Sequence, residues 1–314
     1  MNLKFPEGKS SVFKDGKEAV DYLSSFHTET IETEPDRLKI IHYQNHLYLE
    51  LYDGKIHQFL IRESFFMKLL KWFSFPIRQL DLLDNETITS ICNDYLLNIK
   101  SSKVFIKLED SEALTITSSK FSEILDIDLI NKVIPLGINK LFIDDYNTNI
   151  LVEEKCKIVP FPNDVFGFGL SIMNSETGFS AIHLNDFLFR YICSNGAYIK
   201  EPGHENKFYH YNLFVPDVFK RLEELINNIN YRAKIIETKL RGMASPIKKS
   251  EIFSINKEIF RNTAIRLLND VIDSDTQITK YDLMNLITER AKGLPFGLRT
   301  KIETIAGNLI NLNN

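Results

Sequence analysis

Apolar and polar residues alternate over three short stretches between residues 38 and 61, and polar pairs separate these stretches. The second pair is Asp53-Gly54. An Asp-Gly pair between alternating stretches is among the strongest short signals for a β-hairpin. The pattern therefore predicts a three-stranded antiparallel meander, accompanied by helices, in a first domain over residues 1–100.

Further alternating stretches fill residues 101–214, which we predict to form a second, central antiparallel β domain. Two of these stretches flank the polar segment Asn-Ser-Glu-Thr-Gly at 174–178. Gly178 supplies the positive φ that such a turn requires, so this segment predicts a hairpin. We expect a helical turn over 185–193 and a strand over 208–214.

The last domain, residues 215–314, has helical periodicity, so the chain as a whole is expected to have an α+β fold with a C-terminal all-helical module. Apolar residues recur from Val215 to Met243 at alternating steps of four and three, a period of 3.5 that is typical of a coiled-coil seam. The pattern predicts one long helix whose seam packs on another helix, within the chain or in a homo-oligomer. The seam residues proposed for an oligomer are Phe219, Leu222, Ile226, Ile229, Ile236 and Leu240.

Charge is distributed unevenly along the chain. The formal net charge is -4, but residues 215–314 contain 16 Lys and Arg against 12 Asp and Glu. A basic segment attached to an acidic remainder favours a local anionic partner, although a solvated helix surface explains the same composition. Three widely separated cysteines favour reduced thiols over a disulfide framework.

Basic residues beside aromatic residues indicate a possible single-stranded DNA partner, because phosphates attract cations and unstacked bases stack on rings. Residues 207–211 combine both kinds of side chain, and the segment around 232–249 is basic. The proposed nucleic-acid-binding residues are Arg190, Lys207, Tyr209, Arg232, Lys234, Lys239, Arg241, Lys248 and Lys249.

Catalytic chemistry has weaker support in the sequence. No His or Cys pair has the spacing of a zinc module, and no glycine loop has the phosphate-binding pattern. Cys193 is more simply a structural thiol than a nucleophile. Glu176 is a candidate carboxylate for a metal-dependent nuclease. We therefore assign no catalytic residue, no metal site and no cofactor.

Two spaced motifs carry a resemblance to a known family. The first is Asn174, Ser175, Glu176 and Gly178, and the second is Arg190, Cys193, Asn195 and Gly196. This arrangement resembles the phage/plasmid-like protein family that carries a domain of unknown function. Residues 116–121 and 282–289 are similar to two further elements of that family, with Ser119 and Phe121 in place of its usual Asp and Tyr. The resemblance implies a mobile-element protein but no settled activity, so it gives the motif residues no role.

Three functions remain open at this point. The leading hypothesis is a phage or prophage protein that binds single-stranded DNA and assists annealing or recombination. The first alternative is a non-enzymatic assembly or virion-associated protein that oligomerises through the apolar seam. The second is a metal-dependent nuclease. No apolar stretch has the length of a membrane span and the N-terminal residues have no signal-peptide core, so we expect a cytoplasmic location and no membrane partner.

Overall fold

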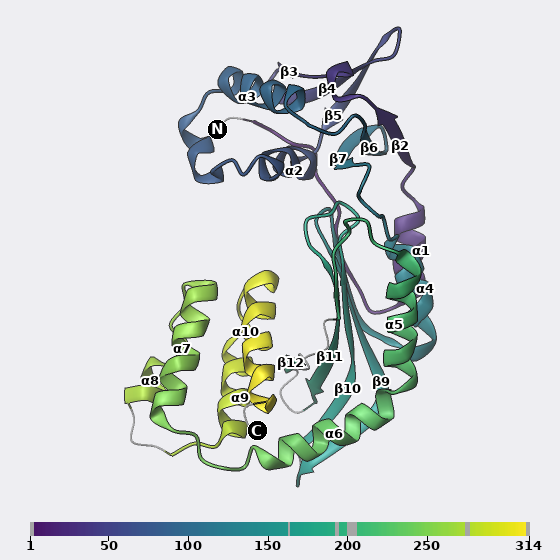
Figure 1. Cartoon of the computed structure of the whole chain (residues 1–314). Coiled ribbons are helices and arrows are strands. Elements are labelled where there is room, and N and C mark those ends of the chain that lie inside the picture. Colours follow the sequence, from purple (N-terminus) through teal and green to yellow (C-terminus); the bar gives the residue numbers. More distant parts are fainter. Residues whose placement is uncertain (1–2, 163, 192–194, 200–205, 274–276, 312–314) are drawn as a thin grey trace.

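The computed structural model describes residues 3–311 except for 163, 192–194, 200–205 and 274–276, and it leaves out the side chains of residues 153–156, 195, 196 and 296. Two β-sheets and a set of C-terminal helices form a crescent (Figure 1). The smaller sheet with α2 and α3 is called the N-terminal lobe, and the remaining helices and strands form the main lobe. Each lobe has its own apolar core. The α+β class predicted from the sequence is confirmed.

The N-terminal lobe is built on a six-stranded sheet of order β2-β6-β7-β5-β4-β3. Helix α2 packs on β7, and α3 packs on β3. The predicted meander is confirmed as β3, β4 and β5, and Gly54 turns the second hairpin at φ +96°. The elements of this lobe are β2 (Thr28–Thr33), β3 (Leu38–Tyr43), β4 (His46–Tyr52), β5 (Ile56–Ile61), α2 (Glu63–Trp72), α3 (Asn85–Leu97), β6 (Val104–Glu109) and β7 (Glu112–Ser118).

Sheet pairing crosses the predicted domain boundary at residue 100. Strands β6 and β7 follow that boundary in sequence, yet they complete the sheet of the N-terminal lobe, where β5 pairs with β7 in parallel. Residues near the N-terminus belong to the main lobe although they precede the N-terminal lobe in sequence, because β1 (Ser10–Phe13) pairs with β8 (Ile138–Asp144) there. The chain therefore passes between the lobes more than once.

The main lobe contains a seven-stranded sheet of order β1-β8-β9-β10-β11-β12, with β13 paired to β11. Strands β10 and β11 form the hairpin predicted around residues 174–178. The remaining strands are β9 (Thr148–Phe161), β10 (Asp164–Asn174), β11 (Ile182–Arg190), β12 (Asn195–Ile199) and β13 (Lys207–Phe208).

Two local predictions in this sheet are wrong. The described part of the expected helical turn over 185–193 continues strand β11 to Arg190. Phe187 and Leu188 are both buried although they point to opposite sides of the sheet, and a strand covered on both sides loses its alternation. The expected strand over 208–214 is limited to the two residues of β13, after which the chain forms a bend.

Helices cover both sides of the main sheet. Figure 1 shows α5 and α6 along its outer side, with α9 and α10 on the opposite side near β12. The helices of this lobe are α1 (Gly16–Ser24), α4 (Asp126–Val133), α5 (Val215–Asn227), α6 (Ile229–Gly242), α7 (Lys249–Thr263), α8 (Asn269–Asp273), α9 (Lys280–Arg290) and α10 (Phe296–Asn308). Short 3-10 turns are found at Pro35–Arg37, Ile77–Leu82, Ile134–Leu136 and Leu309–Asn311.

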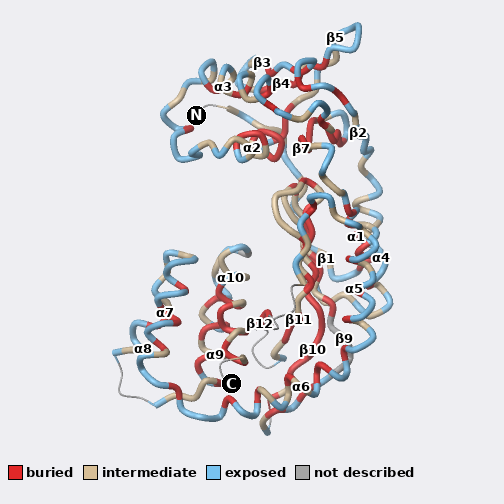
Figure 2. The backbone as a smooth tube through the Cα atoms, in the orientation of Figure 1, coloured by how far each residue is buried: buried red, intermediate tan, exposed pale blue. Residues whose placement is uncertain are grey.

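The apolar seam predicted over 215–243 packs on the chain's own sheet. The prediction of a single long helix is wrong, because the backbone leaves helical geometry at Asn228, and this residue separates α5 from α6. Leu222, Ile229, Ile236 and Leu240 are buried in the core of the main lobe, while Phe219 and Ile226 pack against it. The buried inner side of α5 and α6 is visible in Figure 2. These side chains are therefore not a surface for another copy of the chain.

Candidate functional site

The Asn-Ser-Glu-Thr-Gly turn at 174–178 anchors the hairpin of β10 and β11 to neighbouring segments. Asn174 is fully buried, and its Nδ2 donates to the backbone oxygen of Ile124 and to Oδ1 of Asp126, each at 2.8 Å. Ser175 Oγ donates to the backbone oxygen of Tyr146 at 2.5 Å. Gly178 has φ +70°, which favours glycine. These contacts give the first motif a structural role.

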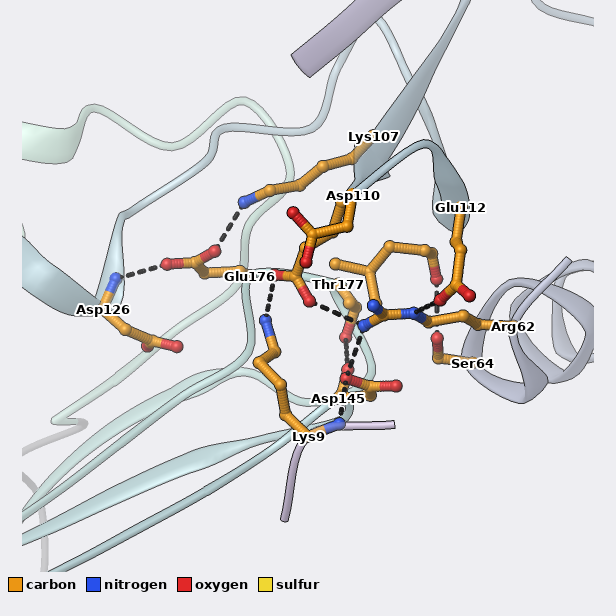
Figure 3. Close-up of polar contacts among 12 residues, drawn as sticks. Lys9, Arg62, Ser64, Lys107, Asp110, Glu112, Asp126, Asp145, Glu176 and Thr177 are labelled. Atoms are coloured by element: carbon orange, nitrogen blue, oxygen red, sulfur yellow. Dashed lines mark hydrogen bonds and ion pairs between the residues drawn. The ribbon is translucent and has the colours of Figure 1, made fainter. Parts of the chain in front are cut away.

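Glu176 joins the two lobes through a buried ion pair. Its carboxylate accepts from Nζ of Lys107 on β6 at 2.5 Å and from the backbone N–H of Asp126 at 2.6 Å (Figure 3). Burial opposes the charges of both side chains, but their mutual attraction outweighs it, so the pKa of Lys107 is raised and that of Glu176 is lowered. Lys107 also donates to Glu123 at 2.7 Å.

Arg62 is the centre of a second charged cluster between the lobes. Its Nη1 donates to Glu109 at 2.6 Å and to Asp145 of the main lobe at 3.2 Å, and its Nε donates to Glu112 at 2.7 Å. Lys9 donates to the other oxygen of Glu109 at 2.5 Å. We call the contacts of Glu176 and Arg62 together the interlobe junction. Its charges are paired with one another, which is typical of buried structural ions.

Asp126 lies beside this junction and has a raised side-chain pKa. The side chain is buried, and its oxygens accept from Asn174 and from Thr148 Oγ1. Burial, and secondarily repulsion from Glu176, raise the pKa of Asp126 to about 7. The carboxyl group of Asp126 therefore titrates near neutral pH.

A cavity of about 420 Å³ opens at the end of the 174–178 turn, where Gly178 lines it. Its walls come from the end of α2, from the segment after β7, from residues 178–181 and from residues 209–211. Five aromatic rings line it, which are those of Trp72, Phe121, Phe179, Tyr209 and Tyr211. We call this space the aromatic cavity. The segments that form it are far apart in sequence, so it exists only in the folded chain.

Two lysines on successive turns of α2 bind the wall of the aromatic cavity. Lys68 Nζ donates to the backbone oxygen of Gly178 at 2.5 Å, and Lys71 Nζ donates to that of Phe179 at 2.8 Å. Both ammonium groups lie over the Phe179 ring, at 5.4 and 5.3 Å from its centroid. Burial and the nearby charge of Lys71 lower the pKa of Lys68 to about 8. Among the described residues that line the cavity, there is no Asp or Glu.

Residues 207–211 bring further aromatic and basic side chains to the rim of the cavity. Lys207 Nζ lies 4.6 Å from the centroid of Tyr209, and Lys120 Nζ lies 5.3 Å from that of Tyr211. Tyr209 and Tyr211 are 63% and 61% exposed. His210 between them is buried, stacks on Phe121 at 4.9 Å and approaches the backbone oxygen of Ser122 through Nδ1. Burial lowers the pKa of His210, which favours the neutral ring with its proton on Nδ1.

A second cavity of about 300 Å³ adjoins the first, and the two share Thr117 and Phe121. Its lining includes Lys107, Glu123 and Glu176, so its one ammonium group is already bound by two carboxylates. The positive charge of Lys107 in this second cavity is therefore compensated within the protein.

Most of the predicted nucleic-acid-binding residues lie elsewhere. Arg232 is the clearest correction, because it is buried, pairs with Asp186 and donates to the backbone oxygen of Leu225. Arg190 is largely covered and binds Asp164 through two nitrogens, at 2.8 and 2.6 Å. Both arginines are used inside the protein, because a buried cation requires a nearby anion.

The basic strip predicted along α6 and the start of α7 does not approach the aromatic cavity wall. Lys234, Lys248 and Lys249 are exposed, and none of them lines the aromatic cavity. Lys239 donates to Asn311 at 3.1 Å, and Arg241 pairs with Glu237 at 2.7 Å. Of the predicted residues, only Tyr209 lines the cavity, and Lys207 lies over its ring.

Sequence reasoning missed Lys68, Lys71 and Trp72 on α2. The signal available was two lysines within an otherwise apolar helical stretch.

The second motif, which runs from Arg190 to Gly196, is described only in part. Cys193 lies outside the described residues, and Asn195 and Gly196 pair through their backbones with Arg190 and Phe189.

The nuclease alternative loses its candidate ligand. Glu176 already binds Lys107 and the backbone of Asp126. Within the described ranges, no three His, Cys, Asp or Glu side chains are grouped as a metal site. Over those ranges there is also no helix with the length and hydropathy needed to cross a bilayer.

Comparison with known protein families, curated proteins and solved structures finds no match to this chain. The resemblance to the phage/plasmid-like family therefore stays a prediction from the two motifs.

Proposed function

We propose that this protein binds single-stranded DNA and that the aromatic cavity receives its bases. The observation that carries the proposal is the combination of five rings with Lys68, Lys71, Lys120 and Lys207 around one opening. Rings stack on unpaired bases of any sequence, and lysines attract phosphates. No described carboxylate lines the opening to repel a polyanion.

The size of the aromatic cavity favours a single strand over a duplex. A volume of about 420 Å³ lies at the lower end of the range in which proteins hold small organic ligands. A base enters such a space only when it is unstacked and unpaired, which is costly in a duplex. The exposed Tyr209 and Tyr211 offer neighbouring bases a stacking surface at the rim.

The proposal moves the binding surface away from the basic strip of α6. It keeps the aromatic and basic cluster at 207–211 and adds α2. A role in annealing or recombination within a mobile element stays a prediction of the resemblance. The apolar seam was the main support for the assembly alternative, and this seam is buried within one chain. The prediction of a homo-oligomer that forms through another surface remains to be tested.

Fluorescence anisotropy with a labelled oligonucleotide tests the proposal. We expect binding of single strands at low salt, weaker binding of the matching duplex, and a loss of affinity as salt rises. Trp72 is the chain's one tryptophan and lines the cavity, so its emission should change on binding. No anisotropy change at micromolar protein and low salt would end the proposal.

The variants Tyr209→Ala and Tyr211→Ala locate the site. Each removed ring should weaken binding by about 1–3 kcal/mol, which is the usual contribution of a base stacked on an aromatic side chain. Tyr52→Ala is the matched control, because Tyr52 is exposed to the same extent, 59%, at the far end of the β4–β5 hairpin. Equal effects of all three variants would contradict binding at the cavity.

A further inference from the structure

Lys68 has a chemical setting that DNA binding alone does not require. Lys120 and Lys207 contact the rings of Tyr211 and Tyr209 outside the cavity lining, and Lys71 in the lining is exposed, whereas Lys68 is half-buried and lines the cavity beside Phe179. Its ammonium group has a second cation, Lys71, one helical turn away and over the same ring. Burial and a neighbouring cation are the two devices that turn a lysine into a nucleophilic amine.

We propose that Lys68 forms an imine with an aldehyde that lies next to a phosphate, the chemistry presented by the ring-opened sugar of an abasic site in single-stranded DNA. In its DNA form the inference rests on the proposed function. A free, phosphorylated small aldehyde presents the same chemistry, so the experiment below separates the two sources.

The reaction balances without any additional reagent. The lone pair of the neutral Nζ attacks the aldehyde carbon, and the carbonyl electron pair moves to oxygen. One proton then moves from the nitrogen to that oxygen, which gives the neutral carbinolamine. A second proton, from solvent, allows the hydroxyl group to leave as water while the carbon–nitrogen double bond forms, and the imine nitrogen keeps its remaining proton. The products are one imine and one water, and no oxidant or reductant is consumed.

The protonation state required by this step is accessible near neutral pH. A lysine with a pKa of about 8 is neutral in a substantial fraction of molecules at pH 7.5, whereas an ordinary lysine is almost fully charged. The titratable groups that line the cavity together with Lys68 are Lys71 on its own helix, Tyr209, His210 and Tyr211, and Lys120 after β7 contacts Tyr211. None of these is a carboxylate that would restore the charge of Lys68.

The backbone oxygen of Gly178 suits the product as well as the free amine. It accepts one N–H from Lys68 at 2.5 Å. A protonated imine retains one N–H, and this single hydrogen can stay on the same acceptor. Lys71 keeps its own bond to the backbone oxygen of Phe179, so a neighbouring phosphate has a second lysine within the cavity wall.

Borohydride trapping tests the inference, with pyridoxal 5′-phosphate as the small probe. At limiting probe and about pH 7.5, we expect Lys68 to be modified roughly 10- to 100-fold more than surface lysines, as measured by peptide mass spectrometry. Trapping at Lys68 should level off above about pH 9, whereas modification of exposed lysines should continue to rise. Random modification with no preference for Lys68 would overturn the inference.

Two variants and a second substrate distinguish the outcomes. Lys68→Arg keeps the charge but removes the nucleophile, so trapping should be lost while the folded signal in circular dichroism is retained. Lys234→Arg, the same exchange at an exposed position on α6 outside the cavity, is the matched control and should leave the trapping unchanged. With an oligonucleotide that contains one abasic site, trapping supports the DNA source, and trapping of pyridoxal phosphate alone supports the small aldehyde. Oligonucleotide binding without any trapping would sink the inference and leave the proposed function intact.

Discussion

The interlobe junction and the aromatic cavity both include residues of the 174–178 turn, yet they use charge in opposite ways. In the junction, Arg62 and Lys107 are bound by carboxylates on several sides. In the cavity, the ammonium groups of Lys68 and Lys71 bind backbone oxygens and lie over the Phe179 ring. The difference teaches that a lysine or arginine indicates an anionic ligand only when the protein leaves its charge uncompensated.

Removal of the Arg62 side chain should have the largest effect, which is a loss of the protein's stability. The variant Arg62→Met leaves Glu109 and Asp145 buried without their shared cation, although Lys9 still contacts Glu109. Breaking a buried ion cluster on one side typically costs about 3–5 kcal/mol of the free energy of unfolding. Urea unfolding measures this loss. Glu112→Gln, whose side chain is 25% exposed and has one contact to Arg62, should cost clearly less.

A wild-type midpoint for Arg62→Met would contradict the description of the junction as a stabilising contact between lobes.

Charge reversal at the cavity should affect binding and leave stability nearly unchanged. In the double variant Lys71→Glu and Lys120→Glu, two cations that face a polyanion become repulsive. We expect affinity for a single-stranded oligonucleotide to fall on the order of 100-fold at low salt, and the salt dependence to become shallower. Anisotropy measures the affinity, and urea unfolding of the same sample separates a binding defect from unfolding.

The pH dependence of stability isolates Asp126 within the junction. Its folded-state pKa is raised from 3.8 to about 7, so its contribution is complete below about pH 4 and is lost as pH rises toward 7. Glu176 has a lowered pKa and acts oppositely, but only as pH falls below its ordinary range. Between about pH 5 and pH 7, wild-type stability should fall by about 2 kcal/mol more than that of Asp126→Asn.

Urea unfolding at several pH values measures this difference. If the stabilities of the two proteins depend on pH in the same way, Asp126 is ionised over this whole pH range. The residues at the junction would then carry one more negative charge than we infer.

The smallest effect is expected at the basic strip. The double variant Lys234→Glu and Lys248→Glu changes net charge by the same amount as the cavity variant, but at exposed positions away from the rings. At physiological ionic strength we expect less than about a twofold change in affinity, because neither lysine lines the cavity and exposed charges are screened beyond about 8 Å. A loss as large as that of the cavity variant would return the binding surface to α6.

Local chemistry in the sequence determined a large part of this fold. Asp53-Gly54 and the polar segment ending in Gly178 predicted hairpins that the structure confirms, because a turn is set by a few neighbouring residues. The helical periodicity after residue 215 likewise predicted helices in the correct region. The cluster at 207–211 was recognised as aromatic and basic, although its strand was shorter than predicted.

Only the tertiary structure decided which charges are available. Arg232 and its partner Asp186 are 46 positions apart, so no spacing rule indicates that this cation is neutralised inside the protein. The stripe from 215 to 243 gives the same period whether it packs on a helix or on a sheet. Lys68 and Tyr209 line the same cavity because the turn between β10 and β11 contacts α2 and because β13, just before Tyr209, pairs with β11. Such contacts depend on the packing of whole elements, and the sequence records each element only by its own period and turns.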